Sequence, residues 1–250
     1  MKNKSEYIKF ILPLLIIFFW FIFTYTGKVP PTSLPSLSAV KDTFIEMLKS
    51  GQLSNDLSLS LRRVLAGFFI SSILGISLGI FMGISSKVKE FFQLTLTAIR
   101  QIPMIAWIPL IILWAGIGEV SKIVVILFAA TFPIVVNTMG GVDSTSETYL
   151  EVAKMYGLSK KDTFFKVYLP SALPNIFTGL RLGLGASWMA VVASELIASS
   201  SGIGYRLNDA RSLMRSDVVI VCMIIIGLVG LLMDKLIVLI SHELTPWKKN

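Results

Sequence analysis

The chain has 250 residues, of which 54% are hydrophobic and only 15% are charged, and its mean hydropathy is +0.76. This composition is too apolar for a soluble domain of the same length, so it indicates an integral membrane protein. The formal net charge of +8 would suggest a nucleic-acid partner in a soluble protein. Here many of the basic residues flank apolar stretches, and no nucleic-acid partner is expected.

Six apolar stretches approach the roughly 20 residues with which a helix crosses a bilayer. In chain order they are residues 8–26, 64–84, 102–119, 122–140, 174–197 and 218–240. We therefore expect an all-α integral membrane protein with one domain, residues 1–250, and six transmembrane helices. The first stretch follows Lys2 and Lys4 as in a secretory signal, but no small-residue cleavage site follows it, which favours an uncleaved anchor.

Residues 27–60 form the connection between the first two stretches. Prolines stiffen its beginning, and residues 38–49 have the pattern of a short amphipathic helix that ends at Gly51. The residues expected on its apolar side are Val40, Phe44, Ile45 and Leu48. We interpret this helix as lying on the outer membrane surface rather than contacting a solute.

Small residues recur every four positions in the second stretch, at Gly67, Ser71, Gly75, Gly79 and Gly83. This spacing puts them on one helix face, where another helix can approach closely. Two interpretations are open: a contact that slides during transport, or tight packing alone. The fifth stretch repeats the pattern with Gly179, Gly183 and Ser187.

Prolines interrupt the third and fourth stretches at positions 103, 109 and 133. Proline removes a helix hydrogen bond, and a bilayer tolerates this where neighbouring helices or a water-filled path satisfy the freed carbonyl groups. The two helices therefore either border a translocation path or are kinked to shape the bundle. Candidate path residues are Met104, Trp107 and Trp114, although Met and Trp equally fit lipid-facing or core positions.

A polar segment, residues 141–170, separates the fourth and fifth stretches. Two serine–acid pairs in it have the spacing of capping boxes and predict two short helices, beginning at Ser144 with Glu147 and at Ser159 with Asp162. Gly157 is expected to end the first helix in the left-handed conformation, and Pro170 to end the second.

The first of these short helices carries an apolar stripe at helical spacing, formed by Tyr149, Val152, Ala153 and Tyr156. A membrane protein has no structural need for two charged helices in a loop, so we interpret the segment as a docking site for a protein outside the membrane. The alternative is that the stripe packs against the ends of the chain's own helices.

Charged residues also interrupt the last two apolar stretches. Arg181 and Asp234 fall at the same depth from one membrane surface, which predicts an ion pair between these stretches, because an unpaired charge in hydrocarbon is costly. Glu195 lies near the opposite surface, before a serine- and glycine-rich segment, and is a candidate for an outer gate or for contact with a delivery protein.

Several absences narrow the function. Cys222 and His242 are the only residues of their types, so the chain has no internal disulfide, no His-based metal site and no serine triad. It also lacks the G-x-x-x-x-G-K-[ST] loop that cradles nucleotide phosphates. We expect no metal, no cofactor and no catalytic residue, and any energy for transport must come from another chain.

The basic residues are distributed unevenly about the apolar stretches. Fourteen of the twenty-three lie in or beside the terminal segments, the second connection and the 141–170 segment, including Lys2 and Lys249. The positive-inside rule then places both termini and residues 141–170 in the cytoplasm. Five arginines fall on the other side and weaken this signal: Arg62, Arg63, Arg206, Arg211 and Arg215.

The 141–170 segment carries the pattern E-A-A, three residues, G, nine residues, I-x-L-P, with matches at Glu151, Ala153, Gly157, Leu169 and Pro170. Val152 replaces an alanine and Val167 an isoleucine. With this pattern the chain resembles the permease subunits of binding-protein-dependent ABC importers. Further motifs resemble the nitrate, sulfonate and taurine branch, over roughly residues 30–240: Leu34-Pro35-Ser36, Arg100-Gln101-Ile102-Pro103 and Ser201-Gly202-Ile203-Gly204-Tyr205.

This resemblance implies the type I importer permease fold, called MetI-like, and a cytoplasmic coupling helix that fits a groove on an ATPase subunit. It implies a homodimer of permeases with two ATPase chains and one extracytoplasmic substrate-binding protein in a bacterial inner membrane. The solute would be an aliphatic sulfonate or taurine, with nitrate, bicarbonate or a vitamin precursor as the alternative. A passive channel would need no coupling loop, and an intramembrane enzyme would need paired catalytic groups.

The segment Ser199–Tyr205 is rich in hydroxyl groups and glycine and is followed by Arg206, Arg211 and Arg215. These residues predict a positive, hydrogen-bonding outer mouth, which suits a small oxyanion. The alternative is that the arginines bind acidic residues of the delivery protein.

Overall fold

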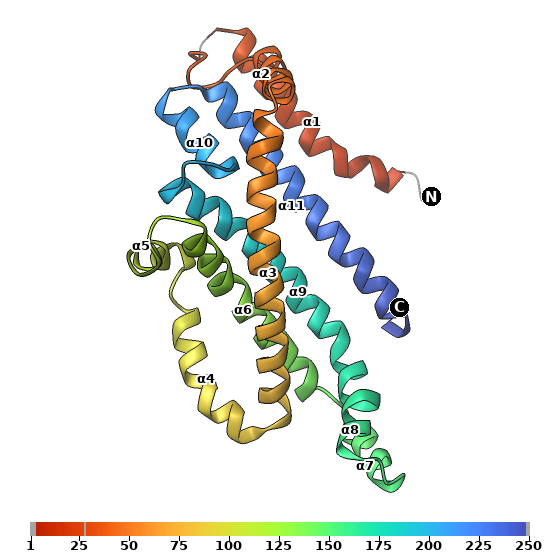
Figure 1. Ribbon diagram of the computed structural model, residues 1–250. Helices are drawn as coiled ribbons and strands as arrows, with labels where there is room; N and C mark the ends of the chain where they lie inside the picture. Colours follow the sequence, from red (N-terminus) through yellow and green to blue (C-terminus); the bar gives the residue numbers. More distant parts are fainter. Residues whose placement is uncertain (1–3, 28, 249–250) are drawn as a thin grey trace.

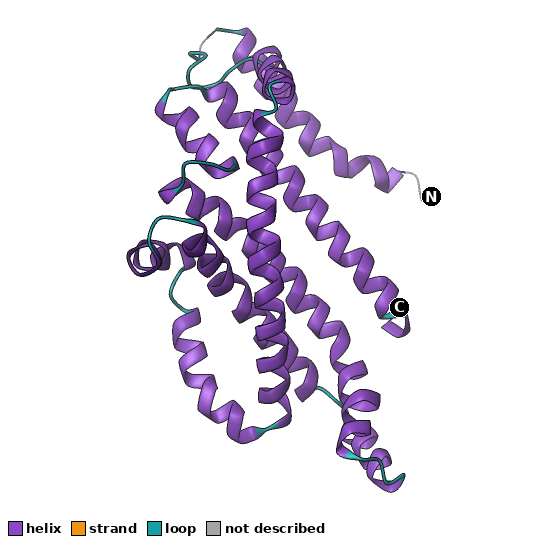
Figure 2. Ribbon diagram, in the orientation of Figure 1, coloured by secondary structure: helices purple, strands orange, loops and turns teal. Residues whose placement is uncertain are grey.

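The computed structural model describes residues 4–27 and 29–248, so Lys2 and Lys249 lie outside the described residues. Every regular element in this part of the chain is a helix (Figure 2). The elements are α1 (Lys4–Tyr25), α2 (Leu37–Lys49), α3 (Gln52–Ile84), α4 (Ser86–Arg100), α5 (Met104–Ala115), α6 (Glu119–Asp143), α7 (Glu147–Met155), α8 (Lys160–Thr163), a π turn (Phe164–Tyr168), α9 (Leu169–Ala198), α10 (Ile203–Ser212), α11 (Ser216–Leu244) and a 3-10 turn (Pro246–Lys248).

Helix α3 runs through the length of the molecule, with α2 and α10 at one end and α7 and α8 at the other (Figure 1). We call these the α10 end and the α7 end. Four helices among the described residues are long and apolar enough to cross a membrane: 52–84, 119–143, 160–198 and 216–244. A fifth span results if α4 and α5 are counted together, while the apolar part of α1, Phe10–Tyr25, is shorter. The predicted count of six is therefore not established.

The third predicted span, residues 102–119, does not form one continuous transmembrane helix. Helix α5 has 12 residues, which is a length of about 18 Å and too short for a hydrocarbon core of about 30 Å. It ends at Ala115, before Gly116 with its φ of +77°, and it is bent by 99° from α4. The polar half of this broken pair, α4, was not predicted because its sequence is amphipathic rather than apolar.

Helix α6 is the centre of the bundle, because two glycine-lined faces pack against it. On α3, an added Cβ at Gly67 would lie 2.6 Å from Ile126, and at Gly75 it would lie 2.7 Å from Ile134. On α9, an added Cβ at Gly183 would lie 2.8 Å from the same Ile134. The small residues thus bring three backbones together, and α3, α6 and α9 form one closely packed unit.

Helix α2 forms where the sequence predicts it, capped by the Ser36 hydroxyl oxygen, which accepts from the Ala39 amide at 3.2 Å. Its buried face differs from the predicted one: the buried residues are Val40, Thr43 and Met47. Phe44, Ile45 and Leu48 are exposed. The helix is turned because it packs on α11, where the Thr43 hydroxyl donates to Asp217 at 2.7 Å.

Candidate functional site

The α7 end carries a helical hairpin, α7 followed by α8. Ser144 does not cap α7 as predicted, because its hydroxyl donates back to the Gly141 carbonyl at 2.9 Å and so completes the end of α6. Helix α7 is preceded by Ser146 instead, two residues later than predicted. The second capping box forms as predicted: the Asp162 amide donates to the Ser159 Oγ at 3.0 Å, and this hydroxyl donates to the Asp162 carboxylate at 2.6 Å.

Gly157 reverses the chain between the two short helices. Its φ is +65°, in the left-handed region that glycine enters without a steric penalty. The Leu158 amide donates to the Ala153 carbonyl at 3.0 Å, and the Gly157 amide donates to the Lys154 carbonyl at 3.0 Å. These two bonds are those of a Schellman motif, so the angle between α7 and α8 depends on residue 157.

Pro170 does not end the second short helix, contrary to the sequence prediction. The helix continues from residue 160 to residue 198 through the π turn Phe164–Tyr168. In this turn the Leu169 amide donates to the Phe164 carbonyl, five residues back, and the widened backbone accommodates a proline that has no amide hydrogen. The hairpin is therefore continuous with the membrane-spanning helix α9.

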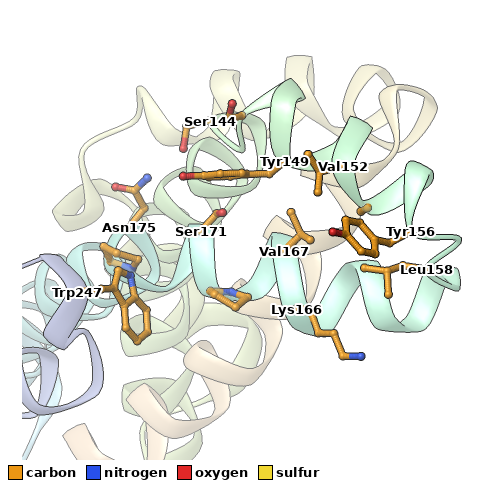
Figure 3. A pocket seen from close by; sticks show the side chains of 14 residues that line it. Ser144, Tyr149, Val152, Tyr156, Leu158, Lys166, Val167, Ser171, Asn175 and Trp247 are labelled. Atoms are coloured by element: carbon orange, nitrogen blue, oxygen red, sulfur yellow. The ribbon is translucent and has the colours of Figure 1, made fainter.

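A hollow of about 860 Å³ opens between α7, the π turn, the start of α9 and the 3-10 turn (Figure 3). Its lining is mainly apolar, with Tyr149, Val152 and Tyr156 from α7 and Trp247 from the end of the chain. Of the predicted stripe only Ala153 is buried, while Tyr149, Val152 and Tyr156 are 62%, 44% and 83% exposed. Within this chain the stripe is thus left largely uncovered.

The five residues of the E-A-A pattern occupy different positions around this hollow. Glu151 is exposed on α7, Ala153 is buried beneath it, and Gly157 forms the turn. Leu169 and Pro170 are half-buried at the start of α9, where Pro170 lines the hollow. The pattern therefore combines an exposed helix with the residues that connect it to α9.

Arg181 on α9 and Asp234 on α11 lie side by side. Nε of Arg181 donates to Oδ1 of Asp234 at 2.5 Å, and Nη2 donates to Oδ2 at 2.7 Å. Both side chains are about half exposed in the single chain, at 51% and 43%. This bidentate pair joins the two helices on the outside of the bundle.

A second hollow, of about 440 Å³, lies between α5, α6 and α9. Met104 and Trp107 line it together with Phe128, whose ring centroid lies 5.4 Å from that of Trp107. Its lining also includes the polar side chains of Arg100, at the end of α4, and Asn137 of α6. Trp114, by contrast, is 68% exposed and does not line this hollow.

Glu195 is 1% exposed at the α10 end, where it is surrounded by hydrogen-bond donors. Its carboxylate accepts from the Ser60 hydroxyl at 2.8 Å, from Arg63 Nη1 at 2.7 Å and from the Gly204 amide at 2.9 Å. In this conformation it contacts neither solvent nor a hollow, and its role in a gate stays a prediction.

The same residues hold the beginning of α10. Its first amide groups donate to side chains of other helices: Gly202 to Asp56 at 3.2 Å, Ile203 to Ser60 at 3.0 Å and Gly204 to Glu195. Helix beginnings need such acceptors, which normally come from the preceding residue. An added Cβ at Gly202, where φ is +105°, would overlap the Glu195 carboxylate. The S-G-I-G sequence is thus explained by the close approach of α10 to Glu195.

Arg63 continues this network to α6. Its Nε and Nη2 donate to the two carboxylate oxygens of Glu119 at 2.7 and 2.6 Å, and the Lys122 ammonium lies 3.2 Å from Oε1 of the same group. Asp56, Ser60, Glu119 and Lys122 were not predicted as site residues, and Arg63 was considered only for its effect on topology. Positions 56, 60 and 63 continue the helical spacing of Gly67 and Ser71 toward the N-terminus, and this signal marks the face of α3 that meets α6 and α9.

The predicted positive mouth is mostly neutralised. Arg206 donates to Asp56 at 2.9 Å, and Arg215 donates to Asp217 at 2.7 Å. Arg211 is exposed. Asp56 is 150 residues from Arg206 in the chain, and Asp217 lies on the next helix, α11. The prediction from the arginines alone therefore overestimated the free positive charge at this end. Within the described residues, no group of three or more His, Cys, Asp or Glu side chains is arranged to hold a metal ion.

Residues 71–245 match the family model described as binding-protein-dependent transport system inner membrane component. The chain belongs to this family. A putative ABC transporter permease of Methanocaldococcus jannaschii is 39% identical over 99% of this chain and 94% of its own. The putative aliphatic sulfonates transport permease of Bacillus subtilis is 37% identical over 96% of this chain and 87% of its own length.

Other relatives carry the names of further solutes. The taurine transport system permease of Escherichia coli is 36% identical over 76% of this chain and 70% of its own. The nitrate import permease of a Synechocystis strain is 37% identical over 75% of this chain and 68% of its own length. Among solved structures, an amino acid ABC transporter crystallised with histidines has a TM-score of 0.65 at 17% identity, covering 80% of this chain and 98% of its own, a likeness of fold.

The protein is therefore a multi-pass membrane permease of an ABC importer, of the sulfonate, taurine and nitrate type, with the MetI-like fold. It is a transport subunit rather than an enzyme. Family membership implies an ATPase and a substrate-binding protein as partners.

Proposed function

We propose that this permease carries an aliphatic sulfonate or taurine into the cytoplasm, driven by ATP hydrolysis on two copies of an ATPase subunit. A second copy of this chain completes the translocation path, and an extracytoplasmic binding protein delivers the solute. In this proposal the α7 end and both termini lie in the cytoplasm, and the α10 end faces outward. The surrounding bilayer is the bacterial inner membrane.

The observation that carries this proposal is the continuity of the hairpin with α9. Helix α7 presents exposed aromatic and apolar side chains beside the hollow, and the helix 160–198 connects that surface directly to the bundle. A partner that grips α7 would therefore move α9 through the Gly157 turn and this continuous helix. We assign ATPase coupling to Glu151, Ala153, Gly157, Leu169 and Pro170.

The path is proposed to pass beside α5, α6 and α9. Met104 and Trp107 line the hollow there, together with the polar side chains of Arg100 and Asn137. An apolar wall with these polar groups suits a solute with an aliphatic body and a polar head. Glu195 is assigned to the outer end of the path, where it holds α10 in place. These residues of one permease would form one half of the path, and a second copy of this chain would form the other half.

The solute is tested by uptake into vesicles that contain the permease, its ATPase and its binding protein. We expect ATP-dependent accumulation of taurine or an alkanesulfonate, and no accumulation with an ATPase variant that lacks its phosphate-binding lysine. Uptake of nitrate, bicarbonate or a neutral heterocycle, with no competition from excess sulfonate, would contradict the solute assignment. Accumulation without ATP hydrolysis would instead indicate a passive channel.

A further inference from the structure

Two buried cations at the α10 end share one exposed carboxylate. The side chains of Arg63 and Lys122 are 3% and 7% exposed, whereas the side chain of Glu119 is 61% exposed. Glu119 nevertheless supplies both oxygens for the Nε–Nη2 edge of Arg63 and the contact for Lys122. The anion in this cluster is thus the member that solvent can reach.

The two cations are fixed by the fold. Arg63 lies on α3 one turn from Gly67, where α3 touches Ile126 of α6, one turn beyond Lys122. The close contact between these helices holds the two side chains in one arrangement. Glu119 is the first residue of α6, and its side chain is 61% exposed, so it has room to turn outward. Turning its side chain outward would leave the cations in place.

Glu195 does not compensate for Glu119. It accepts from Nη1, a different part of the Arg63 guanidinium, and its own side chain is fully buried. Among the described residues, Ser201 Oγ, 3.0 Å from Nη2, is the other group near the Nε–Nη2 edge. Removing the Glu119 carboxylate would therefore leave two buried cations with one buried anion, and another anion must take its place.

We propose that Arg63 and Lys122 form a displaceable oxyanion site, in which the solute's sulfonate group replaces the Glu119 carboxylate. A sulfonate or nitrate presents two oxygens on one atom, as a carboxylate does, and this geometry fits the planar donor edge of an arginine. The exchange leaves the net charge of the cluster unchanged. This inference rests on the proposed function, which places the α10 end outward, where the solute arrives.

The geometry favours a small anion over an acidic side chain of the binding protein. Because the cations are almost fully buried, a competing group must fit into the volume that the Glu119 carboxylate vacates. A free sulfonate enters that volume without a protein backbone beside it. The binding protein's own carboxylates are the competing occupant, and the experiment separates the two.

The test is a titration of the purified full-length permease in nanodiscs with methanesulfonate, at constant ionic strength set with chloride. Anion binding to the folded state raises the unfolding temperature, and the concentration dependence gives the apparent Kd. The Glu119 carboxylate is a tethered competitor with a high effective concentration. Glu119→Gln should therefore lower the apparent Kd by about tenfold or more, and Lys122→Gln should raise it by about tenfold.

The matched control is Asp143→Asn, which removes the exposed carboxylate that pairs with Lys89 at the opposite end of the molecule. It should leave the apparent Kd of methanesulfonate unchanged. If Glu119→Gln does not yield folded protein, Glu119→Asp keeps the charge on a shorter side chain, and the apparent Kd should fall by a smaller factor.

An unchanged Kd in folded Glu119→Gln, or an equal change in Asp143→Asn, would overturn the proposal. If Glu119→Gln tightens binding of the binding protein but not of methanesulfonate, the site belongs to a protein carboxylate and the small-anion assignment is wrong. The uptake assay separates this inference from the proposed function. Sulfonate uptake with no effect of Glu119 on anion binding overturns this site alone.

Discussion

Arg181 and Asp234, 53 residues apart in the chain, form a two-bond ion pair between α9 and α11 on the outside of the bundle. A charge at the centre of a bilayer costs about 2.5–3.5 kcal/mol on the insertion scale, so each residue needs the other if this face meets lipid. The pair therefore links helix packing to membrane insertion.

A double-mutant cycle tests this pair. Arg181→Gln and Asp234→Asn should each lower the free energy of unfolding in mixed micelles, because each leaves one charge unpaired. The double variant should lose less than the sum, with a coupling energy of about 0.5–3 kcal/mol. Strictly additive losses would show that the two side chains do not stabilise each other.

The glycine-lined contact gives a second prediction. Gly75→Ala places a Cβ 2.7 Å from Ile134, so the α3–α6 contact must open and stability should fall by about 1–3 kcal/mol. Gly227→Ala on α11 is the control, since a Cβ there meets nothing within 4 Å. Thermal unfolding of both variants measures the loss of stability in Gly75→Ala relative to the control. A stable Gly75→Ala protein that fails only in transport would favour a sliding contact over tight packing.

A third prediction concerns the side chains of other helices that accept hydrogen bonds from the first amide groups of α10. Ser60→Ala leaves the Ile203 amide without its acceptor and removes one donor from Glu195, so about 1–3 kcal/mol of stability should be lost. The loss should appear as faster hydrogen exchange at the start of α10. Ser58→Ala, whose hydroxyl donates only to the Asn55 carbonyl on an exposed surface, should exchange as wild type does. Equal exchange at α10 in both variants would show that the cap is unimportant.

Sequence reasoning succeeded where the signal is local. The four-residue spacing on α3 predicted the close approach of another helix, which the structure shows to be α6, and Ser159 and Gly157 predicted a cap and a turn from their own neighbourhoods. It failed at Pro170, because a proline rule based on the α-helix does not allow for a π turn. The apolar run at 102–119 was expected to form one proline-kinked span, but only residues 104–115 of it form a helix, which is bent by 99° from α4.

The network at the α10 end could not be predicted in the same way. Arg63 and Glu195 are 132 residues apart, and Arg63 and Glu119 are 56 apart, so their contact depends on how α3, α6 and α9 pack. Asp56, which neutralises Arg206, lies 150 residues away in the chain and is hidden for the same reason, whereas Asp217 is only two residues from Arg215. Residue type marked Glu195 as unusual, but only the fold identifies its partners.

Membrane orientation gives a fourth prediction. In a Cys222→Ala background, Ser159→Cys marks the α7 end and Leu213→Cys marks the α10 end, where Leu213 is 67% exposed. In intact cells, a membrane-impermeant thiol reagent should label Leu213→Cys but label Ser159→Cys only after the membrane is opened. Labelling of Ser159→Cys in intact cells would reverse the proposed topology.

The central claim is that an ATPase drives this permease through the α7–α8 hairpin, and Gly157 tests it most directly. Valine at φ near +65° is strained by about 1–3 kcal/mol, which misplaces α8, whereas asparagine tolerates that conformation. The measurement is ATP hydrolysis stimulated by the loaded binding protein in reconstituted complexes of wild type, Gly157→Asn and Gly157→Val. We expect Asn to retain the stimulation and Val to lose it by about tenfold or more, with the permease still inserted. A Gly157→Val complex that holds the ATPase at wild-type stoichiometry, with full stimulation, would contradict the claim.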